Sequence, residues 1–255
     1  MLSIVTLNCN GLRSAIKKDF LAWVEKQNPD IICLQETKIH QRDLNEQLKN
    51  VLLYDTYYFS AEKPGYSGVA IWAKAKPKAV YTGIGIPSYD TEARIIRLEY
   101  EKLSVASVYF PSGTSGDERQ TVKEQFLEDF FAYAQNIKTP IVFSGDFNIA
   151  HAEPDIHHPE KHHKYSGFLP HERKWFSKLL ESGYTDAYRH IFPEKNEYSW
   201  FTYRANARNK NLGWRIDDHI VSNNIAPNIQ NVKIIQDSVF SDHCPVLLNL
   251  NCKLN

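Results

Sequence analysis

The chain opens with LSIVTLN at residues 2–8 and returns with DIICL at residues 30–34. The first stretch alternates as a half-buried strand does, and the second is continuously apolar, which is typical of a fully buried strand. Between them, Ser14 is placed to cap a helix that runs towards Asn28-Pro29, where a proline would end it. The order strand, helix, strand predicts a β-α-β opening.

Further strands are predicted at residues 67–73, 94–99, 104–109, 140–144, 213–222 and 244–249, with helices near 117–136 and 170–181. Several strands follow one another in residues 67–109 without room for crossover helices, which disfavours a single doubly wound sheet. We therefore predict an α/β sandwich, in which two sheets pack face to face and helices cover the outer faces. Because no repeat or linker interrupts the pattern, residues 1–255 are expected to form one domain.

Composition narrows the class of protein. The chain has 255 residues, of which 42% are hydrophobic, enough for a large core. No run approaches the roughly 20 apolar residues that cross a bilayer, and the start lacks a signal peptide, so no membrane association is expected. The four cysteines lack metal-type CxxC spacing, and Cys9 and Cys33 lie in apolar, strand-like surroundings, so a reducing cytoplasm is the expected setting. Lysine plus arginine and aspartate plus glutamate are both 30, so net charge does not indicate a nucleic-acid partner.

Acidic and amide residues recur where the apolar strands end. They are Asn8, Asn10, Glu36, Asp146, Asn148 and Asp242, the last followed by His243. Any one of them is most often a turn or cap residue, but strand ends are also where a rigid scaffold displays reactive groups. Oxygen ligands of this kind suit Mg²⁺, whereas the lack of a His/Cys cage argues against structural zinc. No GxSxG elbow supports serine acyl chemistry.

A second pattern covers residues 198–216, which contain no acidic residue. The basic residues are Arg204, Arg208, Lys210 and Arg215, and the aromatic ones include Trp200 and Trp214. Charge runs are usually solvated faces, and aromatic residues usually belong to the core. Their combination favours a phosphate-contacting surface beside a flat-walled pocket.

A third pattern is the histidine-rich segment 151–171, which contains His151, His157, His158, His162, His163 and His171. A metal site is one interpretation, but His-rich tracts are compositional signals, and a solvated loop is the interpretation we favour. Several of these rings would become charged below about pH 6.5 and tighten DNA binding.

Seven short motifs occur in one order along nearly the whole chain: LNCNGLR (7–13), LQE (34–36), GYSGVA (65–70), YFP (109–111), GDFN (145–148), GWRID (213–217) and SDH (241–243). In this respect the chain resembles the exonuclease III family of abasic-site endonucleases. The resemblance implies the fold of the endonuclease/exonuclease/phosphatase superfamily, a four-layer α/β sandwich with two mainly antiparallel or mixed sheets.

The resemblance also implies a metal-dependent site. Glu36 would be the principal Mg²⁺ ligand, with Asn8 and Asp242 beside the metal and the phosphate. Mn²⁺ would be a possible substitute for Mg²⁺.

The same resemblance assigns the catalytic groups. Asp146 would position or deprotonate the attacking water, and Asn148 would aim it. His243, oriented by Asp217, would hold the scissile phosphate, and Tyr109 would contact the phosphate or assist the leaving oxygen.

The implied substrate is duplex DNA, cut 5′ to an abasic site to leave a 3′ hydroxyl, with 3′-5′ exonuclease and 3′-end trimming at the same site. Trp200, Trp214 and Ile216 would form the walls of the pocket for the baseless sugar, and a monomer is expected.

A phosphoinositide phosphatase shares the fold and metal chemistry and is the rival activity. A non-catalytic module should lack Glu36, Asp146 or His243, and all three residues are present.

Two positions depart from the family pattern. Asp218 and His219 follow WRID where an aromatic or bulky apolar residue is usual, and alternation puts Asp218 on the side of Trp214 and Ile216. An additional carboxylate there could recruit a cation or weaken DNA binding, but we expect Asp218 to lie exposed at the strand end. Ser112 stands where some members have Asn.

Overall fold

The computed structural model describes the backbone of residues 1–255 and every side chain except that of Gln47. A seven-stranded sheet has the order β12-β13-β1-β2-β5-β4-β3, and a six-stranded sheet has the order β10-β11-β9-β8-β7-β6. The first comprises β1 (Leu2–Asn8), β2 (Ile31–Gln35), β3 (Asn50–Val51), β4 (Tyr54–Phe59), β5 (Val69–Ala73), β12 (Ile229–Ile234) and β13 (Val246–Leu250). The second comprises β6 (Ala79–Thr82), β7 (Ile95–Glu99), β8 (Ser104–Tyr109), β9 (Ile141–Asp146), β10 (Tyr184–Asp186) and β11 (Asp217–Ser222).

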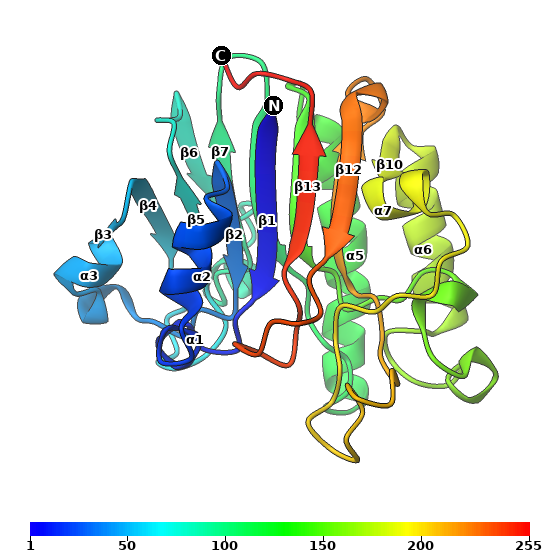
Figure 1. The fold of residues 1–255 in the computed structure, drawn as a ribbon. Coiled ribbons are helices and arrows are strands. Elements are labelled where there is room, and N and C mark those ends of the chain that lie inside the picture. The colour runs from blue at the N-terminus through cyan, green and yellow to red at the C-terminus, as the bar shows by residue number, and fades with distance from the viewer.

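Helices cover the outer faces of the two sheets (Figure 1). The α-helices are α1 (Leu12–Ile16), α2 (Phe20–Gln27), α3 (Glu46–Lys49), α4 (Pro87–Asp90), α5 (Asp117–Asn136), α6 (Pro170–Glu181) and α7 (Ala187–Ile191). Short 3₁₀ helices occupy Gln41–Asp43, Glu153–Asp155, Pro159–Lys161 and Ala226–Asn228. None of the described helices combines the length and the apolar character that crossing a bilayer requires.

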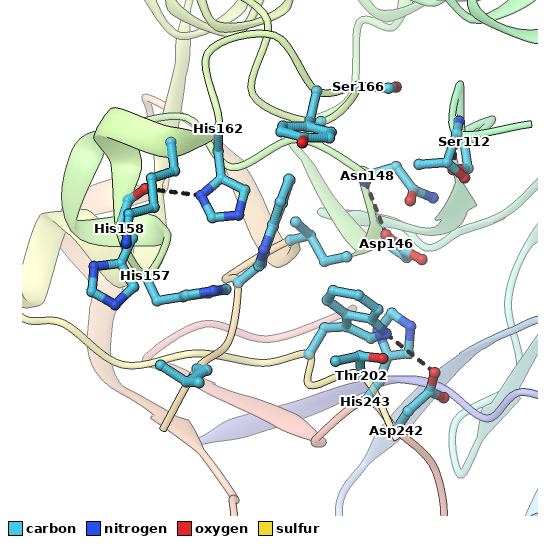
Figure 2. Close-up of a pocket in the computed structure, with 18 of the residues that line it drawn as sticks. Ser112, Asp146, Asn148, His157, His158, His162, Ser166, Thr202, Asp242 and His243 are labelled. Atoms are coloured by element: carbon cyan, nitrogen blue, oxygen red, sulfur yellow. Dashed lines mark hydrogen bonds between the residues drawn. The ribbon is translucent and has the colours of Figure 1, made fainter. Parts of the chain in front are cut away.

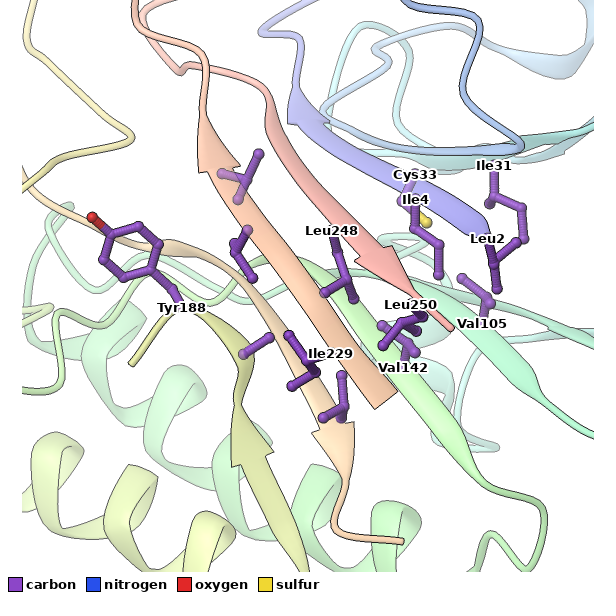
Figure 3. Packing of buried hydrophobic residues seen from close by; sticks show 14 of the residues in the cluster. Leu2, Ile4, Ile31, Cys33, Val105, Val142, Tyr188, Ile229, Leu248 and Leu250 are labelled. Atoms are coloured by element: carbon purple, nitrogen blue, oxygen red, sulfur yellow. The ribbon is translucent and has the colours of Figure 1, made fainter. Parts of the chain in front are cut away.

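Three hydrophobic clusters separate the four layers. Between the sheets, Ile4 and Leu248 pack with Val105 and Val142 (Figure 3). On the outer face of the first sheet, the side chains of alternate strand positions pack against the α2 residues Phe20 and Val24. On the outer face of the second sheet, aromatic residues of α5 and α6 pack against β8 and β9, where they meet Phe143; they include Phe126, Phe130, Trp175 and Phe176. This arrangement confirms the predicted four-layer α/β sandwich.

The β-α-β opening is also present, because β1 and β2 pair in parallel with helical segments between them. The expected cap at Ser14 is wrong, because Ser14 lies inside α1 and Gly11 precedes that helix. The segment forms two helices, with Asp19 in a left-handed conformation (φ 64°) between them. The strand expected at 213–222 begins only at Asp217.

Strand pairing brings the predicted site residues to one end of the molecule. Asp217 on β11 lies opposite Asp146 on β9, and Tyr109 on the parallel β8 lies on the other side of Asp146. Asn8 ends β1 in the facing sheet, and Glu36 follows β2 directly. The two chain termini lie at the opposite end of the sheets (Figure 1).

Candidate active site

Asn8 connects the two sheets at the site. Its side-chain nitrogen donates to Glu36 Oε1 at 2.8 Å and to Asp146 Oδ2 at 2.9 Å. Its side-chain oxygen accepts the backbone N–H of Asn10, which fixes the orientation of the amide. Asn8 is fully buried, so these bonds hold the two carboxylates in place.

Asp146 is buried at the end of β9. Burial raises the pKa of its carboxyl to about 7; the nearby His243 opposes this effect and Asp217 adds to it. Asp146 Oδ1 accepts the backbone N–H of Asn148 at 2.9 Å, and Asn8 holds the other oxygen. A carboxylate with a pKa near neutrality is suited to accept a proton from water at physiological pH.

His243 and Asp217 form a buried pair. His243 Nδ1 lies 2.9 Å from Asp217 Oδ2 and 3.1 Å from Oδ1, and Ser199 Oγ donates to the same carboxylate at 2.6 Å. Burial alone would lower the pKa of His243, but the charge and hydrogen bond of Asp217 outweigh it and raise the pKa to about 10. His243 is therefore a cation at neutral pH, with Nε2–H left to donate. Ser199 was missed by sequence reasoning, because a single serine among aromatic residues carries no distinguishing signal.

Glu36 lies beside a basic group that the sequence analysis did not single out. Lys38 Nζ is 2.9 Å from Glu36 Oε2 and also donates to Asn10 Oδ1 at 2.6 Å. Burial raises the pKa of Glu36, but Lys38 and Asn8 together lower it below the ordinary value, so the carboxylate is ionised. Asn10 continues the chain of contacts to Asp242 Oδ1 at 3.1 Å.

Tyr109 lines the same pocket as these groups. Burial, with a smaller contribution from Glu36, raises the pKa of its hydroxyl well above the ordinary value. The hydroxyl therefore keeps its proton and can donate a hydrogen bond.

The donor atoms at this end of the sheets fit a hard cation. Asp146, Asp217 and His243 each offer an atom within 4.8 Å of the others, and they are the group of this kind found among the described residues. We discount the His243 nitrogen as a ligand, because a ring held as a cation has no free lone pair. The carboxylates that remain, together with Glu36, are the oxygen donors that Mg²⁺ or Mn²⁺ accepts. Asp242 lies outside this group and instead accepts from Asn10 and Trp200.

A cavity of about 700 Å³ opens over these side chains (Figure 2). Trp200, Trp214 and Ile216 line it, as expected for a flat-walled pocket. The two indole rings meet edge to face, with centroids 6.3 Å apart. Trp200 Nε1 donates to Asp242 Oδ2 at 3.1 Å, which fixes the indole beside the catalytic groups.

The expectation that Arg215 contacts DNA is wrong. Its side chain is 1% exposed and forms ion pairs with Asp155, Asp186 and Asp218. The expectation that Asp218 lies exposed at the strand end is wrong for the same reason, since it is a buried partner of this arginine. The four side chains are buried and do not line the pocket.

Arg208 is also engaged within the protein. Its guanidinium donates to the backbone carbonyls of Ser238, Ser241 and Asp242, and so fixes the loop that carries His243. Arg204 and Lys210 are exposed, and they remain the basic residues of this segment that are free to meet a phosphate backbone.

His219 and Ser112, two of the residues that depart from the family pattern, lie in different environments. His219 is buried between the sheets, where its ring contacts Ser144 Oγ at 2.8 Å and the Val246 carbonyl at 2.9 Å. Burial lowers the pKa of His219 to about 4, so it is neutral. Ser112 lines the pocket and shares a hydrogen bond with Thr114 Oγ1.

The histidine-rich segment is partly the solvated loop that we expected, since His158, His163 and His171 are exposed, but part of it lines the pocket. His157, His158 and His162 line the pocket, whereas His163 does not. His151 is directed elsewhere, because it contacts Ser177 Oγ at 2.8 Å and stacks on Phe176.

Comparisons with known proteins agree with this geometry. The sequence model of the Endonuclease/Exonuclease/phosphatase family matches residues 5–243. An exodeoxyribonuclease of Bacillus subtilis (strain 168) is 40% identical over 254 residues, covering 98% of this chain and 100% of that protein. The structure of an AP endonuclease from Archaeoglobus fulgidus superposes with a TM-score of 0.91 at 29% identity, covering 99% of this chain and 100% of that one. A 3′ phosphatase from Neisseria bound to a product DNA hairpin gives a TM-score of 0.92 at 28% identity, with 99% and 100% coverage.

Proposed function

The chain belongs to the endonuclease/exonuclease/phosphatase family, and we propose that it is a Mg²⁺-dependent DNA-repair nuclease that cuts duplex DNA 5′ to abasic sites. The product is a 3′ hydroxyl, and the same site trims 3′ ends. The similar proteins include an exodeoxyribonuclease, an AP endonuclease and a 3′ phosphatase, which together span these reactions. The enzyme acts as a monomer.

The observation that carries this proposal is the pairing of a proton acceptor and a cation at one pocket. Burial raises the pKa of Asp146 to about 7, and Asp217 raises the pKa of the neighbouring His243 to about 10. One group can take a proton from water while the other donates to a phosphoryl oxygen. This combination supports hydrolysis of a phosphodiester, because it activates the water and stabilises the charge that develops on the phosphate.

Each side chain has a separate task in the reaction. Asp146 deprotonates the water, and Asn148, whose Nδ2 donates to the Phe110 carbonyl at 2.9 Å, leaves its Oδ1 to orient that water. The imidazolium of His243 holds the scissile phosphate, and the Tyr109 hydroxyl donates to the phosphate or to the departing oxygen. A Mg²⁺ ion held at this site would supply positive charge against the negative charge on the departing 3′ oxygen.

Glu36 is the principal oxygen ligand of the metal, with Asn8 and Asp242 beside the metal and the phosphate. Glu36 is ionised, and its neighbour Lys38 pairs with it at 2.9 Å, so a divalent cation would displace an existing positive charge. Mn²⁺ has similar ligand preferences and substitutes for Mg²⁺.

Selection of the abasic site depends on Trp200, Trp214 and Ile216. A sugar without a base leaves the duplex at lower cost, since no base pair is broken and little stacking is lost. Arg204 and Lys210, both exposed, add affinity for any duplex.

The test uses end-labelled duplexes that carry an abasic analogue, a recessed 3′ end or a 3′ phosphate, each incubated with Mg²⁺ or with chelator. We expect Mg²⁺-dependent incision 5′ to the analogue and Mg²⁺-dependent processing of the two 3′ ends. Release of phosphate from a phosphoinositide, with the abasic duplex left intact, would contradict the proposal and favour a lipid phosphatase.

A further inference from the structure

The pocket has a second half that the proposed reaction does not use. Its outer side is formed by His157, His158, Lys161 and His162, which we call the histidine wall. These residues line the same cavity as Asp146 and the other catalytic side chains. Figure 2 shows the His162 ring projecting from this segment towards the cavity.

The histidine wall continues the wall of the sugar pocket. The His162 ring meets Trp214 edge to face with centroids 5.4 Å apart, and the His157 and His162 rings are 4.9 Å apart. The cavity of about 700 Å³ is much larger than one deoxyribose. It therefore has room for the backbone of the adjoining nucleotide beside the flipped sugar.

Backbone contacts fix which ring nitrogens are free. His157 Nδ1 lies 3.1 Å from the Gly213 carbonyl, and His162 Nδ1 lies 2.8 Å from the His158 carbonyl. A carbonyl oxygen only accepts, so both Nδ1 atoms carry the hydrogen. Nε2 is then an acceptor in the neutral ring, which a phosphate oxygen would repel, and a donor only in the cation.

The charges around the histidine wall are mostly positive. Burial lowers the pKa of His157; His162, His158 and Lys161 lower it further, and the hydrogen bond to Gly213 opposes them. The acidic side chain paired with the wall is Glu160, whose Oε1 lies 3.5 Å from His158 Nδ1, with both side chains exposed. An anion placed between the rings would relieve this repulsion and favour their protonation.

We propose that the histidine wall is a subsite for a phosphate of the DNA strand next to the cleaved bond, and that His157 or His162 takes up a proton when that phosphate binds. This inference rests on the proposed function, because it requires a DNA strand in the pocket. A neutral wall that stacks on a base or a sugar would bind without a proton, so proton uptake distinguishes the two arrangements.

The experiment is calorimetric titration of an abasic-analogue duplex into protein carrying Asp146→Asn. That substitution stops cleavage and removes the one pocket carboxyl whose pKa is near 7. His243 is already protonated at neutral pH, because its pKa is raised to about 10, so it takes up no further proton. Binding heats at pH 7 in two buffers of different ionisation enthalpy give the number of protons taken up.

We expect about one proton per complex, and an affinity that rises by up to about tenfold per pH unit as the pH falls from about 7.5 to about 6.5. In the same background, His157→Gln with His162→Gln should abolish the uptake and reduce the salt dependence of log K by about one. The matched control is His171→Gln. His171 is a histidine of the same segment whose Nε2 pairs with Glu124 at 2.9 Å, away from the pocket, and this variant should keep both properties.

Three outcomes would overturn the inference. Proton uptake that persists in the double histidine variant would place the titrating group elsewhere. If the double histidine variant binds the duplex more weakly by the same factor at all pH values, the histidine wall contacts a base or a sugar. Failure of both the wild-type protein and the Asp146→Asn variant to bind the duplex would refute the proposed function, and the subsite with it.

Discussion

The substitution Asp217→Asn tests whether the charge of Asp217 keeps His243, the proposed phosphate-binding cation, protonated. Asparagine keeps an oxygen that can accept from His243 Nδ1, so the ring orientation is preserved while the negative charge is lost. Burial favours the neutral ring, and Asp217 is the largest effect opposing it. The rise in the pKa of His243 from 6.5 to about 10 corresponds to about 5 kcal/mol of preference for the cation.

Without that carboxylate, Asp146 and Asp242 alone oppose burial, and the pKa of His243 is expected to fall well below 10 in the metal-free protein. The measurement is an NMR titration of the ring protons in chelator, with His243→Asn to assign the signal. Cleavage of abasic duplex at pH 7.5 should fall by up to about 100-fold, because a larger share of the His243 rings would be neutral.

The same shift makes the fold pH-dependent. A group whose pKa is raised from 6.5 to about 10 on folding stabilises the folded state fully below pH 6.5, and this contribution is lost as the pH rises through about 10. Asp217→Asn should therefore lower the free energy of unfolding at pH 7 more than at pH 10. A His243 ring that still titrates near pH 10 in the variant would refute this reasoning.

Three further changes test separate parts of the site. Glu36→Gln should lose activity and regain part of it at raised Mg²⁺, since a neutral ligand weakens the ion; an unchanged metal titration would contradict this. Trp214→Ala should lower the ratio of abasic to undamaged cleavage more than duplex binding, and Lys210→Ala should do the reverse across a salt series; equal slowing of both duplexes would place Trp214 in the core. Arg215→Met should destabilise the fold by about 3–5 kcal/mol in chemical denaturation, because Asp186 and Asp218 lose their cationic partner and Asp155 keeps only Arg189; an unchanged midpoint would argue against that network.

The strand-end residues could be located from the sequence because their signal is local. The predicted strands end in the structure at Asn8, just before Glu36 and at Asp146, and the paired strands then bring these ends to one edge. Hydrophobic periodicity cannot show that residues more than 100 positions apart belong to one site. The order of the seven family motifs does indicate this, and the 2.9 Å contact between Asn8 and Asp146 is an example.

The role of Arg215 could not be predicted in this way. Its partners Asp155 and Asp186 lie 60 and 29 residues away along the chain. Asp218 lies three residues beyond it, on β11. A basic residue in an acid-free segment looks exposed when only its sequence neighbours are considered. The carboxylates that neutralise Arg215 reach it through tertiary contacts, which the local sequence does not show.

Strand β12 and the fold of the histidine-rich segment were not predicted from the sequence. β12, with the sequence IQNVKI, alternates as a strand does, but it is short and polar on one face. His157 and His162 lie in a polar stretch that folds back onto Gly213 and Trp214, and the sequence contains no signal for that return.

The most direct test of the central claim compares Asp146→Asn with the wild-type protein on one abasic duplex, measuring affinity and single-turnover cleavage in Mg²⁺. If Asp146 is the proton acceptor, cleavage falls by about 10²–10⁴-fold while the dissociation constant stays nearly unchanged, because the lost interaction belongs to the transition state. Near-normal cleavage in the variant would contradict the account.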